Sequence, residues 1–279
     1  MKSSQFKLFA VLFLGLIFFS FTLQQPTDDS IQLTSEKIDG KVVYYASNSN
    51  YCPYTLNIDF PKLQNVKASV DLPFRTVVPA QTEKIKLFEL TPKPNSATSY
   101  SISMGYSKGD FNAKHNDGVV YQLPYLKGTS HSVDQGYGGK FSHHMKGRKY
   151  ALDFSMENGT DVYAARAGIV VETRSSDSKG GSHPSFQNSG NYITIYHEDG
   201  TFANYFHLKK GGVKVKNGET VEAGQLIGQS GNTGWSSGPH LHFEVFSYSG
   251  INEVTSVPVK FLVDGKAIEL EEGKVYTNN

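Results

Sequence analysis

Cysteine is nearly absent from this chain of 279 residues, and several familiar catalytic motifs are missing. Cys52 is the single cysteine, so no intrachain disulfide can form, and we interpret it as a buried structural thiol. The sequence contains no CxxC pair, no glycine-rich phosphate-binding loop and no HExxH motif. These absences argue against a disulfide framework, nucleotide chemistry and a zinc-protease helix of the HExxH type.

A strong charge of either sign is also lacking, because the net charge is only +1. Nothing therefore indicates electrostatic capture of nucleic acid or of an acidic membrane surface. Methionine is scarce as well, with 4 residues against 16 Tyr, 18 Phe and 27 Gly, a balance that favours a β-rich protein. The length allows two domains of ordinary size with ample apolar material for a core.

The most apolar stretch of the chain lies at its N-terminus. Lys2 and Lys7 precede the run Leu8–Leu23, which is almost wholly apolar. This pattern predicts that residues 1–25 are a secretory signal peptide or, if retained, an N-terminal membrane anchor. It also predicts that the protein is secreted or lies in the periplasm or cell envelope. No cysteine follows the run, which argues against lipid attachment there.

Strand-like patterns occupy the rest of the chain, so the expected fold class is all-β. In residues 30–106, short runs such as Tyr54–Phe60 alternate apolar and polar side chains between prolines, which predicts a small β-sandwich-like accessory domain. Residues 107–134 are rich in turn-forming residues and indicate a connection. We expect the second domain at residues 135–250, and residues 251–279 should add short strands that close the fold.

The stretch Gly238–Phe246 carries the strongest chemical signal in the sequence. Period-two alternation places His240, His242 and Glu244 on one face of a strand and apolar side chains on the other. Such a strand holds its two imidazoles about 6–7 Å apart. The glycine-rich run Gly228–Pro239 predicts a long irregular loop that delivers this strand to a site.

Two further polar residues are expected near the same site. Asp153 faces away from the apolar side chains of Tyr150–Phe154, and a buried carboxylate needs a cation or several donors. We expect His207 to line a groove, whereas His197, at the turn end of its strand, is expected to be exposed.

Aromatic residues and one polar loop are expected to form the walls of the groove: Tyr192, Tyr205, Trp235 and Ser175–Gly190.

The candidate catalytic residues are one histidine of the pair His143 and His144, together with Asp153, His207, His240 and His242. A hydrolytic zinc site commonly takes three N or O ligands from the protein and leaves a fourth position to water. Zinc lowers the pKa of that water and polarises a substrate carbonyl. Two His and one Asp as ligands would leave two imidazoles to deprotonate the water and stabilise the developing oxyanion.

These candidates stand in an ordered series of motifs: Phe141-Ser142-His143, Tyr150–Phe154, Gly190–Tyr192, Tyr205–Leu208, Gly228–Gly234 and Gly238–Phe243. The series resembles the M23 family of zinc metallopeptidases, the lysostaphin-like or LytM-like enzymes that cleave peptide bonds in bacterial peptidoglycan. The resemblance runs from Gly136 to Phe246. It implies a mostly antiparallel β-sheet domain with a groove over the sheet.

The resemblance implies that three residues hold one zinc ion (Zn²⁺) per chain: His143, Asp153 and His242. His207 and His240 would then be the two catalytic imidazoles that do not bind the metal. The chain departs from the family in one respect, because the first motif is often a compact HxxxD whereas nine residues separate His143 from Asp153. We favour His143 as the ligand because we expect it to end a strand, with His144 beginning a loop, but the sequence alone leaves both open.

These expectations lead to a secreted zinc-dependent metalloendopeptidase that cleaves peptide cross-links or stems of bacterial peptidoglycan by metal-activated water. Peptidoglycan peptides are the expected substrate, and no nucleic-acid partner is expected. Two alternatives remain open at this point. One is a non-catalytic peptidoglycan-binding or partner-activating module on the same fold, and the other is a zinc peptidase that acts on protein outside the cell wall. The sequence does not fix the oligomeric state.

Overall fold

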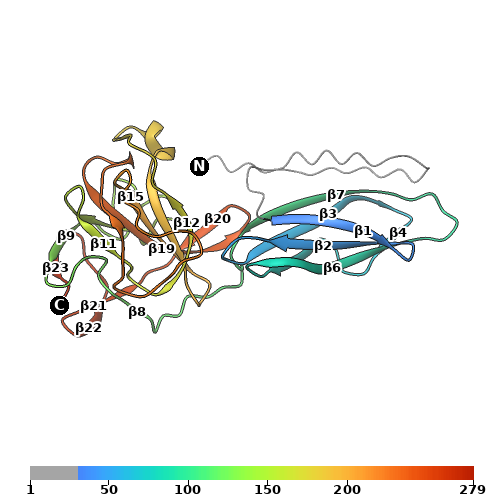
Figure 1. Cartoon of the computed structure of the whole chain (residues 1–279), viewed down its shortest axis with the longest axis horizontal. Helices are drawn as coiled ribbons and strands as arrows, with labels where there is room; N and C mark the ends of the chain where they lie inside the picture. The colour runs from blue at the N-terminus through green and yellow to red at the C-terminus, as the bar shows by residue number, and fades with distance from the viewer. Residues whose placement is uncertain (1–30) are drawn as a thin grey trace. The chain divides into compact units, whose positions relative to one another are not determined.

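The computed structural model describes residues 31–279, and nearly all of its regular elements are β-strands (Figure 1). The signal peptide or anchor expected at residues 1–25 lies outside the described residues. Among the residues that are described, no helix is long and apolar enough to cross a membrane. The described chain divides into two compact units, residues 31–110 and Phe111–Asn279.

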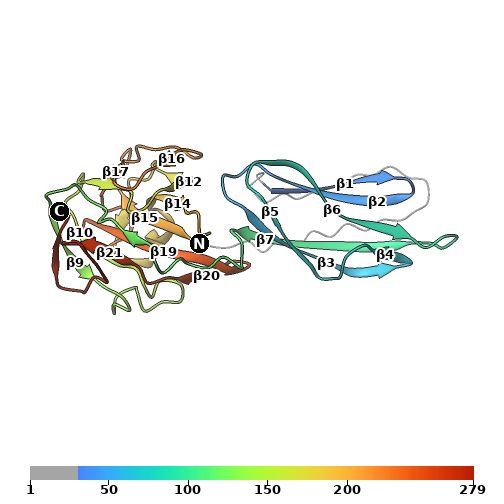
Figure 2. The same ribbon diagram turned by 90° about the horizontal axis from the view of Figure 1, so that it is seen from below.

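The unit of residues 31–110 is a sandwich of two antiparallel sheets (Figure 2). One sheet has the order β1 (Ile31–Ile38), β2 (Lys41–Asn48), β6 (Thr82–Pro92), β4 (Val66–Ala68). The other has the order β5 (Phe74–Val78), β3 (Tyr54–Gln64), β7 (Ser99–Lys108). Aromatic rings join the two sheets, since the ring of Phe60 lies 6.1 Å from that of Tyr44 and 5.8 Å from that of Phe88. The all-β prediction is confirmed for this unit.

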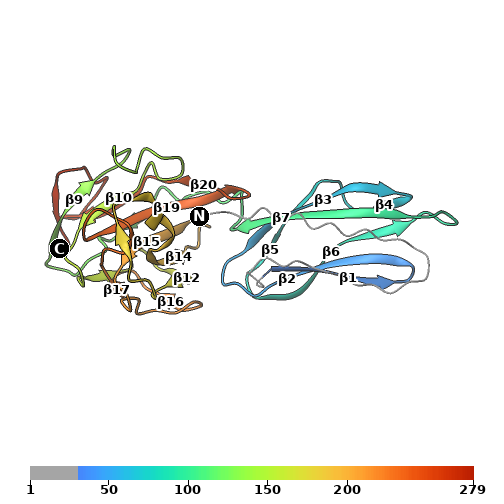
Figure 3. The same cartoon turned by 90° about the horizontal axis from the view of Figure 1, so that it is seen from above.

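The unit Phe111–Asn279 is built on one nine-stranded antiparallel sheet (Figure 3). Its order is β16 (Thr220–Val221), β12 (Gly168–Arg174), β14 (Asn191–Tyr196), β15 (Phe202–Leu208), β19 (His240–Gly250), β10 (Leu152–Ser155), β9 (Ser130–Gln135), β23 (Val275–Thr277), with β20 (Glu253–Ser256) paired to β19. β19 therefore lies between β15 and β10, in the middle of the sheet. This arrangement confirms the predicted mostly antiparallel sheet.

Three small sheets and one short helix complete this unit. They are β11 (Asp161–Tyr163) with β17 (Leu226–Gln229), β13 (Gly180–Gly181) with β18 (Gly234–Trp235), β8 (Val120–Tyr121) with β21 (Lys260–Val263) and β22 (Lys266–Ile268), and the 3₁₀ helix η1 (Pro184–Asn188). β13 and β18 pair in parallel, with Gly180 opposite Gly234. The pairing fixes the loop before β14 against the loop before β19.

The two faces of β19 separate the core from the polar groups. On one face, three apolar side chains are at most 1% exposed: Leu241, Phe243 and Val245. They pack with buried side chains of the neighbouring strands, among them Phe154 of β10 and Tyr205 of β15. Because side chains alternate along a strand, the histidines of β19 face the other way. The hydrophobic core thus holds in place the strand on which the polar groups stand.

Candidate active site

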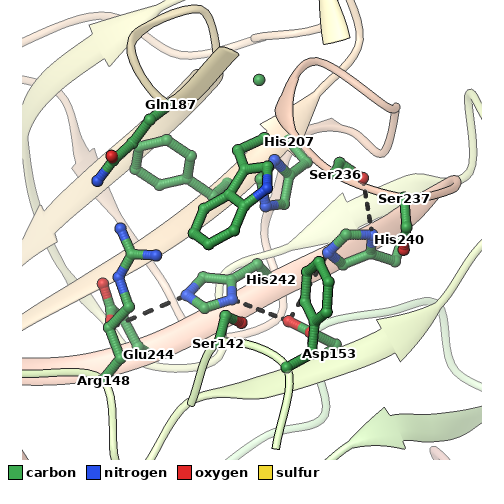
Figure 4. A pocket seen from close by; sticks show the side chains of 14 residues that line it. Ser142, Arg148, Asp153, Gln187, His207, Ser236, Ser237, His240, His242 and Glu244 are labelled. Carbon is green, nitrogen blue, oxygen red and sulfur yellow. Dashed lines mark hydrogen bonds and ion pairs between the residues drawn. The ribbon is translucent and has the colours of Figure 1, made fainter. Parts of the chain in front are cut away.

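β10 and β19 bring a carboxylate and an imidazole together. In the antiparallel register of the two strands, Asp153 lies directly opposite His242. Atom Nδ1 of His242 lies 2.8 Å from Oδ1 of Asp153, on the face of the sheet away from the core (Figure 4). Gln135 of β9 donates from Nε2 to Oδ2 of the same carboxylate at 2.8 Å. The register of adjacent strands, rather than closeness in sequence, therefore builds this part of the site.

The third group, His143, comes from a segment of turns before β10. We expected a strand to end at His143, but residues 136–151 contain no strand. His143 is fully buried and donates from Nδ1 to the carbonyl oxygen of Gly136 at 2.9 Å. Its Nε2 lies 3.3 Å from Oδ1 of Asp153 and has no hydrogen-bond partner among the described residues. The neighbouring His144 is exposed.

The side chains of His143, Asp153 and His242 fit a divalent cation site. One donor atom from each of them lies within 4.8 Å of the other two. Two ligands of tetrahedral zinc, at bond lengths of about 2.0–2.2 Å, are about 3.3–3.6 Å apart. From Oδ1 of Asp153, Nε2 of His143 lies at 3.3 Å and Nδ1 of His242 at 2.8 Å. A cation would also satisfy the unpartnered Nε2 of His143. The bonds from His143 to Gly136 and from Gln135 to Asp153 orient the donors, as outer hydrogen bonds do in metal sites.

The charges of this cluster are strongly coupled. Burial alone would raise the pKa of the Asp153 carboxyl, but the neighbouring imidazoles of His143 and His242 hold that pKa well below its usual value. Burial opposes the charged form of His242, yet the carboxylates of Asp153 and Glu244 raise its pKa to about 9. Without a metal, the imidazole of His242 is therefore protonated on both nitrogens and positively charged. Because a histidine ligand binds a metal in its neutral form, cation binding would displace one of these two protons.

His207 reaches the same pocket through an unusual backbone conformation. Strict alternation along β15 would place His207 on the face of Tyr205, which is fully buried in the core. The backbone of His207 has a φ of +64°, in the left-handed region that residues other than glycine rarely adopt. His207 consequently lines the pocket, where its ring centroid lies 4.6 Å from that of His240 and 5.9 Å from that of His242.

Hydrogen bonds and burial set the protonation of His207. Its Nδ1 donates to the carbonyl oxygen of Thr233 at 2.7 Å. Burial, followed by the nearby His240 and His242, lowers its pKa to about 3. His207 is therefore neutral at physiological pH, with its proton on Nδ1 and a lone pair on Nε2.

His240 is oriented like His207, with its Nδ1 toward a backbone carbonyl oxygen. Its Nδ1 lies 2.8 Å from the carbonyl oxygen of Gly238 and 3.2 Å from Oγ of Ser236. Its Nε2 lies 3.7 Å from Oδ1 of Asp153. A carbonyl oxygen only accepts, so Nδ1 carries the proton and Nε2 is the atom that faces the carboxylate. The structure thus places four of the five predicted site residues on the lining of one pocket, and the fifth, His143, lies buried 3.3 Å from the carboxylate of Asp153.

The walls of the pocket only partly match the expectation from sequence. Trp235 is a wall, as expected, and its ring contacts that of Phe141, which also lines the pocket, at 5.6 Å between ring centroids. The indole donates from Nε1 to the carbonyl oxygen of Ser182, so the loop before β14 does border this wall. Tyr205 is not a wall, since it is fully buried and its hydroxyl accepts from the Ala165 amide within the core.

Among the residues that line the pocket, Phe141, Arg148 and Glu244 had no expected role. Glu244 shares the open face of β19 with His242, and its Oε2 lies 3.9 Å from Nε2 of that histidine. Strand alternation had indicated this shared face but had given Glu244 no chemical role. The other two lie in the turn-rich segment before β10, where the sequence carries no periodic pattern that could have identified them.

One expectation for a histidine outside the pocket was wrong. His197 is fully buried instead of exposed. Its Nδ1 donates to the carbonyl oxygen of Ala167 at 2.8 Å, and the ring of Tyr121 lies 6.0 Å from its ring. Burial lowers the pKa of His197 to about 4. A structural role in the core explains this residue.

Known proteins resemble this chain in the same region. The sequence pattern of peptidase family M23 matches residues 147–255, which include Asp153, His207, His240 and His242. Over 93 residues, the chain is 45% identical to peptidoglycan DD-endopeptidase ShyA of Vibrio cholerae serotype O1, a match of 33% of this chain and 19% of that protein. Over 151 residues, it is 37% identical to lysostaphin of Staphylococcus simulans, a match of 54% of this chain and 27% of lysostaphin.

The similarity concerns one domain of those relatives, because the chain matches much less than two thirds of either protein. The solved catalytic domain of the Staphylococcus simulans lysostaphin is 32% identical, with 46% of this chain and 87% of that domain covered and a TM-score of 0.33. The match to the family pattern and these sequence identities agree with the resemblance of the motifs. The chain belongs to peptidase family M23, a family of metallopeptidases.

Proposed function

We propose that this protein is a secreted, zinc-dependent metalloendopeptidase that hydrolyses peptide bonds in the cross-links or stems of bacterial peptidoglycan. One observation carries the proposal: three buried ligand-type side chains lie together, and two of them line a pocket that two further imidazoles also line. Relatives named as peptidoglycan endopeptidases support the choice of substrate. Since peptidoglycan lies outside the cytoplasm, the signal expected at residues 1–25 is consistent with this substrate.

In this proposal His143, Asp153 and His242 hold the zinc ion, which acts as a Lewis acid on water and on the substrate carbonyl. The two imidazoles that are left, His207 and His240, handle protons. Each one has its Nδ1 proton committed to a carbonyl oxygen and can accept a proton at Nε2. Once protonated there, an imidazole can stabilise a developing negative charge or pass its proton to the departing amine.

Metal dependence is tested first on the purified full-length protein. Treatment with a zinc chelator should abolish the release of peptides from purified peptidoglycan, and added zinc should restore it. Elemental analysis should find about one zinc ion per chain. Undiminished hydrolysis in the presence of chelator, with the metal shown to be gone, would refute the zinc mechanism.

The variant His240→Ala separates catalysis from binding. We expect its rate of hydrolysis to fall by about 10²–10⁴-fold, the usual contribution of a general acid or base, while its zinc content stays unchanged. An exposed histidine provides the matched control, and His144→Ala should keep full activity. If His240→Ala hydrolyses peptidoglycan at the wild-type rate, a non-catalytic binding role becomes the better account of the pocket. Hydrolysis of casein but not of peptidoglycan would instead indicate a protein substrate.

A further inference from the structure

The long spacer between His143 and Asp153 places a cation at one end of the pocket. Arg148 belongs to this spacer and lines the same cavity as His242 and Glu244. In Figure 4 the guanidinium of Arg148 and the side-chain amide of Gln187 point toward one another beside Glu244. Within residues 31–279, the guanidinium makes no hydrogen bond and no ion pair, and its interaction with Glu244 is an electrostatic attraction alone. A cation whose hydrogen-bond donors are unused thus faces the space next to the proposed metal site.

Glu244 does not account for this cation. Its Oε1 accepts a hydrogen bond from Nδ2 of Asn204 at 3.2 Å, and its Oε2 lies 3.9 Å from Nε2 of His242. Oε2 of Glu244 has no hydrogen-bond partner among the described residues, and Arg148 attracts this carboxylate without forming an ion pair with it. Arg148 therefore keeps its planar set of donors available for another group.

The donors at this end of the pocket suit an anion with two oxygens. A guanidinium binds a carboxylate through two parallel hydrogen bonds, which is its strongest and most specific contact. The amide of Gln187 can supply another donor. The cavity measures about 70 Å³, and a single water needs about 10–15 Å³ on the same measure, so a carboxylate group fits.

We propose that Arg148 determines specificity by binding a free carboxylate of the peptide substrate, either an acidic side chain or a C-terminal carboxylate. The inference rests on the proposed function, because it assumes that a peptide occupies this pocket. It adds a requirement on the substrate: the peptide carries a negative charge close to the bond that is cleaved.

The test compares matched peptides that differ only in this charge. Tetraglycine as the free acid and as the C-terminal amide tests the terminal carboxylate. Gly-Gly-Asp-Gly amide and Gly-Gly-Asn-Gly amide test a side-chain carboxylate. Binding is measured by calorimetry on the zinc-loaded full chain of the His240→Ala variant, so that the result does not depend on turnover.

We expect at least one carboxylate peptide to bind about ten- to a hundredfold more tightly than its amide partner. Adding Arg148→Ala should remove this preference by weakening the carboxylate peptide alone, and Arg148→Lys should restore only part of it, because a lysine lacks the planar fork. Lys146→Ala is the matched control on the same spacer and should change nothing, since its side chain is 84% exposed.

Two results would overturn the inference. One is equal or undetectable binding of all four peptides. The other is a loss in Arg148→Ala that is the same for carboxylate and amide peptides, which would make Arg148 a structural counter-ion of Glu244. Failure of the proposed function shows itself differently, as an absence of peptidoglycan hydrolysis by the zinc-loaded wild-type protein, and it leaves the binding comparison intact.

Discussion

Replacing Asp153 by Asn keeps the size of the side chain but removes the negative charge from the centre of the proposed metal site. In the metal-free protein the change turns one of two acceptor oxygens into an amide donor. Gln135 cannot rotate to compensate, because its Oε1 accepts hydrogen bonds from the amides of Phe141 at 2.9 Å and Ser142 at 3.1 Å. We expect the metal-free variant to lose about 1–3 kcal/mol of stability, the usual cost of one unsatisfied buried polar group.

The effect on metal binding should be larger and separable. Zinc at a thousand times its dissociation constant stabilises a protein by about 4.1 kcal/mol. Loss of an anionic ligand should weaken binding at least as much as loss of an outer hydrogen bond, about 100-fold at the upper end. At the same zinc concentration the stabilisation then falls to about 1.4 kcal/mol. In a unit the length of Phe111–Asn279, each kcal/mol of added stability raises Tm by about 2–4 °C. Zinc should therefore raise Tm by about 8–16 °C in the wild type and by about 3–6 °C in the variant.

Thermal unfolding with and without zinc, followed by calorimetry at a fixed metal concentration, measures both quantities. Asp161→Asn is the control of matched chemistry, because Asp161 lies on β11 outside the pocket and accepts one hydrogen bond from Gln229 at 3.1 Å. It should leave the zinc-induced shift unchanged. If Asp153→Asn shows the same zinc-induced shift as the wild type, Asp153 does not bind the metal and the proposed site is wrong.

Three further predictions concern stability and the walls of the pocket. Arg166→Ala should lower the free energy of unfolding, measured in urea, by about 3–5 kcal/mol. The reason is that the change removes the cation from the carboxylate of Asp199, whose side chain is 10% exposed. A loss below about 1 kcal/mol would contradict this expectation. Burial holds the pKa of His197 at about 4, so between pH 6.5 and 4 the unfolded chain binds a proton that the folded chain does not. Stability should therefore fall as pH is lowered through that window, by about 3 kcal/mol more in the wild type than in His197→Gln, and equal falls in urea titrations would refute the assignment. Trp235 is the only tryptophan, and its ring contacts that of Phe141. Phe141→Ala should therefore shift the fluorescence emission to longer wavelength and increase quenching by acrylamide. An unchanged spectrum would show that the two rings do not touch in solution.

Alternation along the strands was enough to predict the all-β class and the open face of β19. It works there because β19 lies in the middle of a sheet whose one face is buried, so a shift by one residue would expose Leu241 and Phe243. The same rule indicated that Asp153 faces away from the core. Each of these inferences depends only on residues that are neighbours in the sequence, so the pattern of one strand is enough to make it.

His207 shows where the alternation rule stops. The rule groups this residue with Tyr205, yet the two side chains end in different environments, one in the pocket and one in the core. The cause is a single backbone angle, the φ of +64° at His207. Residues in such conformations cost of order 1–3 kcal/mol each and concentrate at functional sites. No pattern of residue types reveals such a position in advance.

His197 shows a second kind of limit. Its place next to a turn suggested exposure, although its alternation with Ile193 and Ile195, both fully buried, indicated the opposite. Its burial depends on Tyr121, a residue 76 positions earlier in the chain that packs against its ring. A sequence pattern cannot show which distant segment covers a strand end, so the burial of this histidine could be found only in the structure.

The spacer between His143 and Asp153 departs from the compact form of the motif without disturbing the site, and the structure explains why. Asp153 is placed by its register with β19, while His143 is placed independently by its bond to Gly136. Because neither position depends on the number of residues between them, the spacer can lengthen freely. A segment that starts and ends beside the proposed ligands returns to the pocket whatever its length, and it can therefore present Arg148 there. The same extra residues that weaken the motif as a sequence signal give the pocket its unpaired cation.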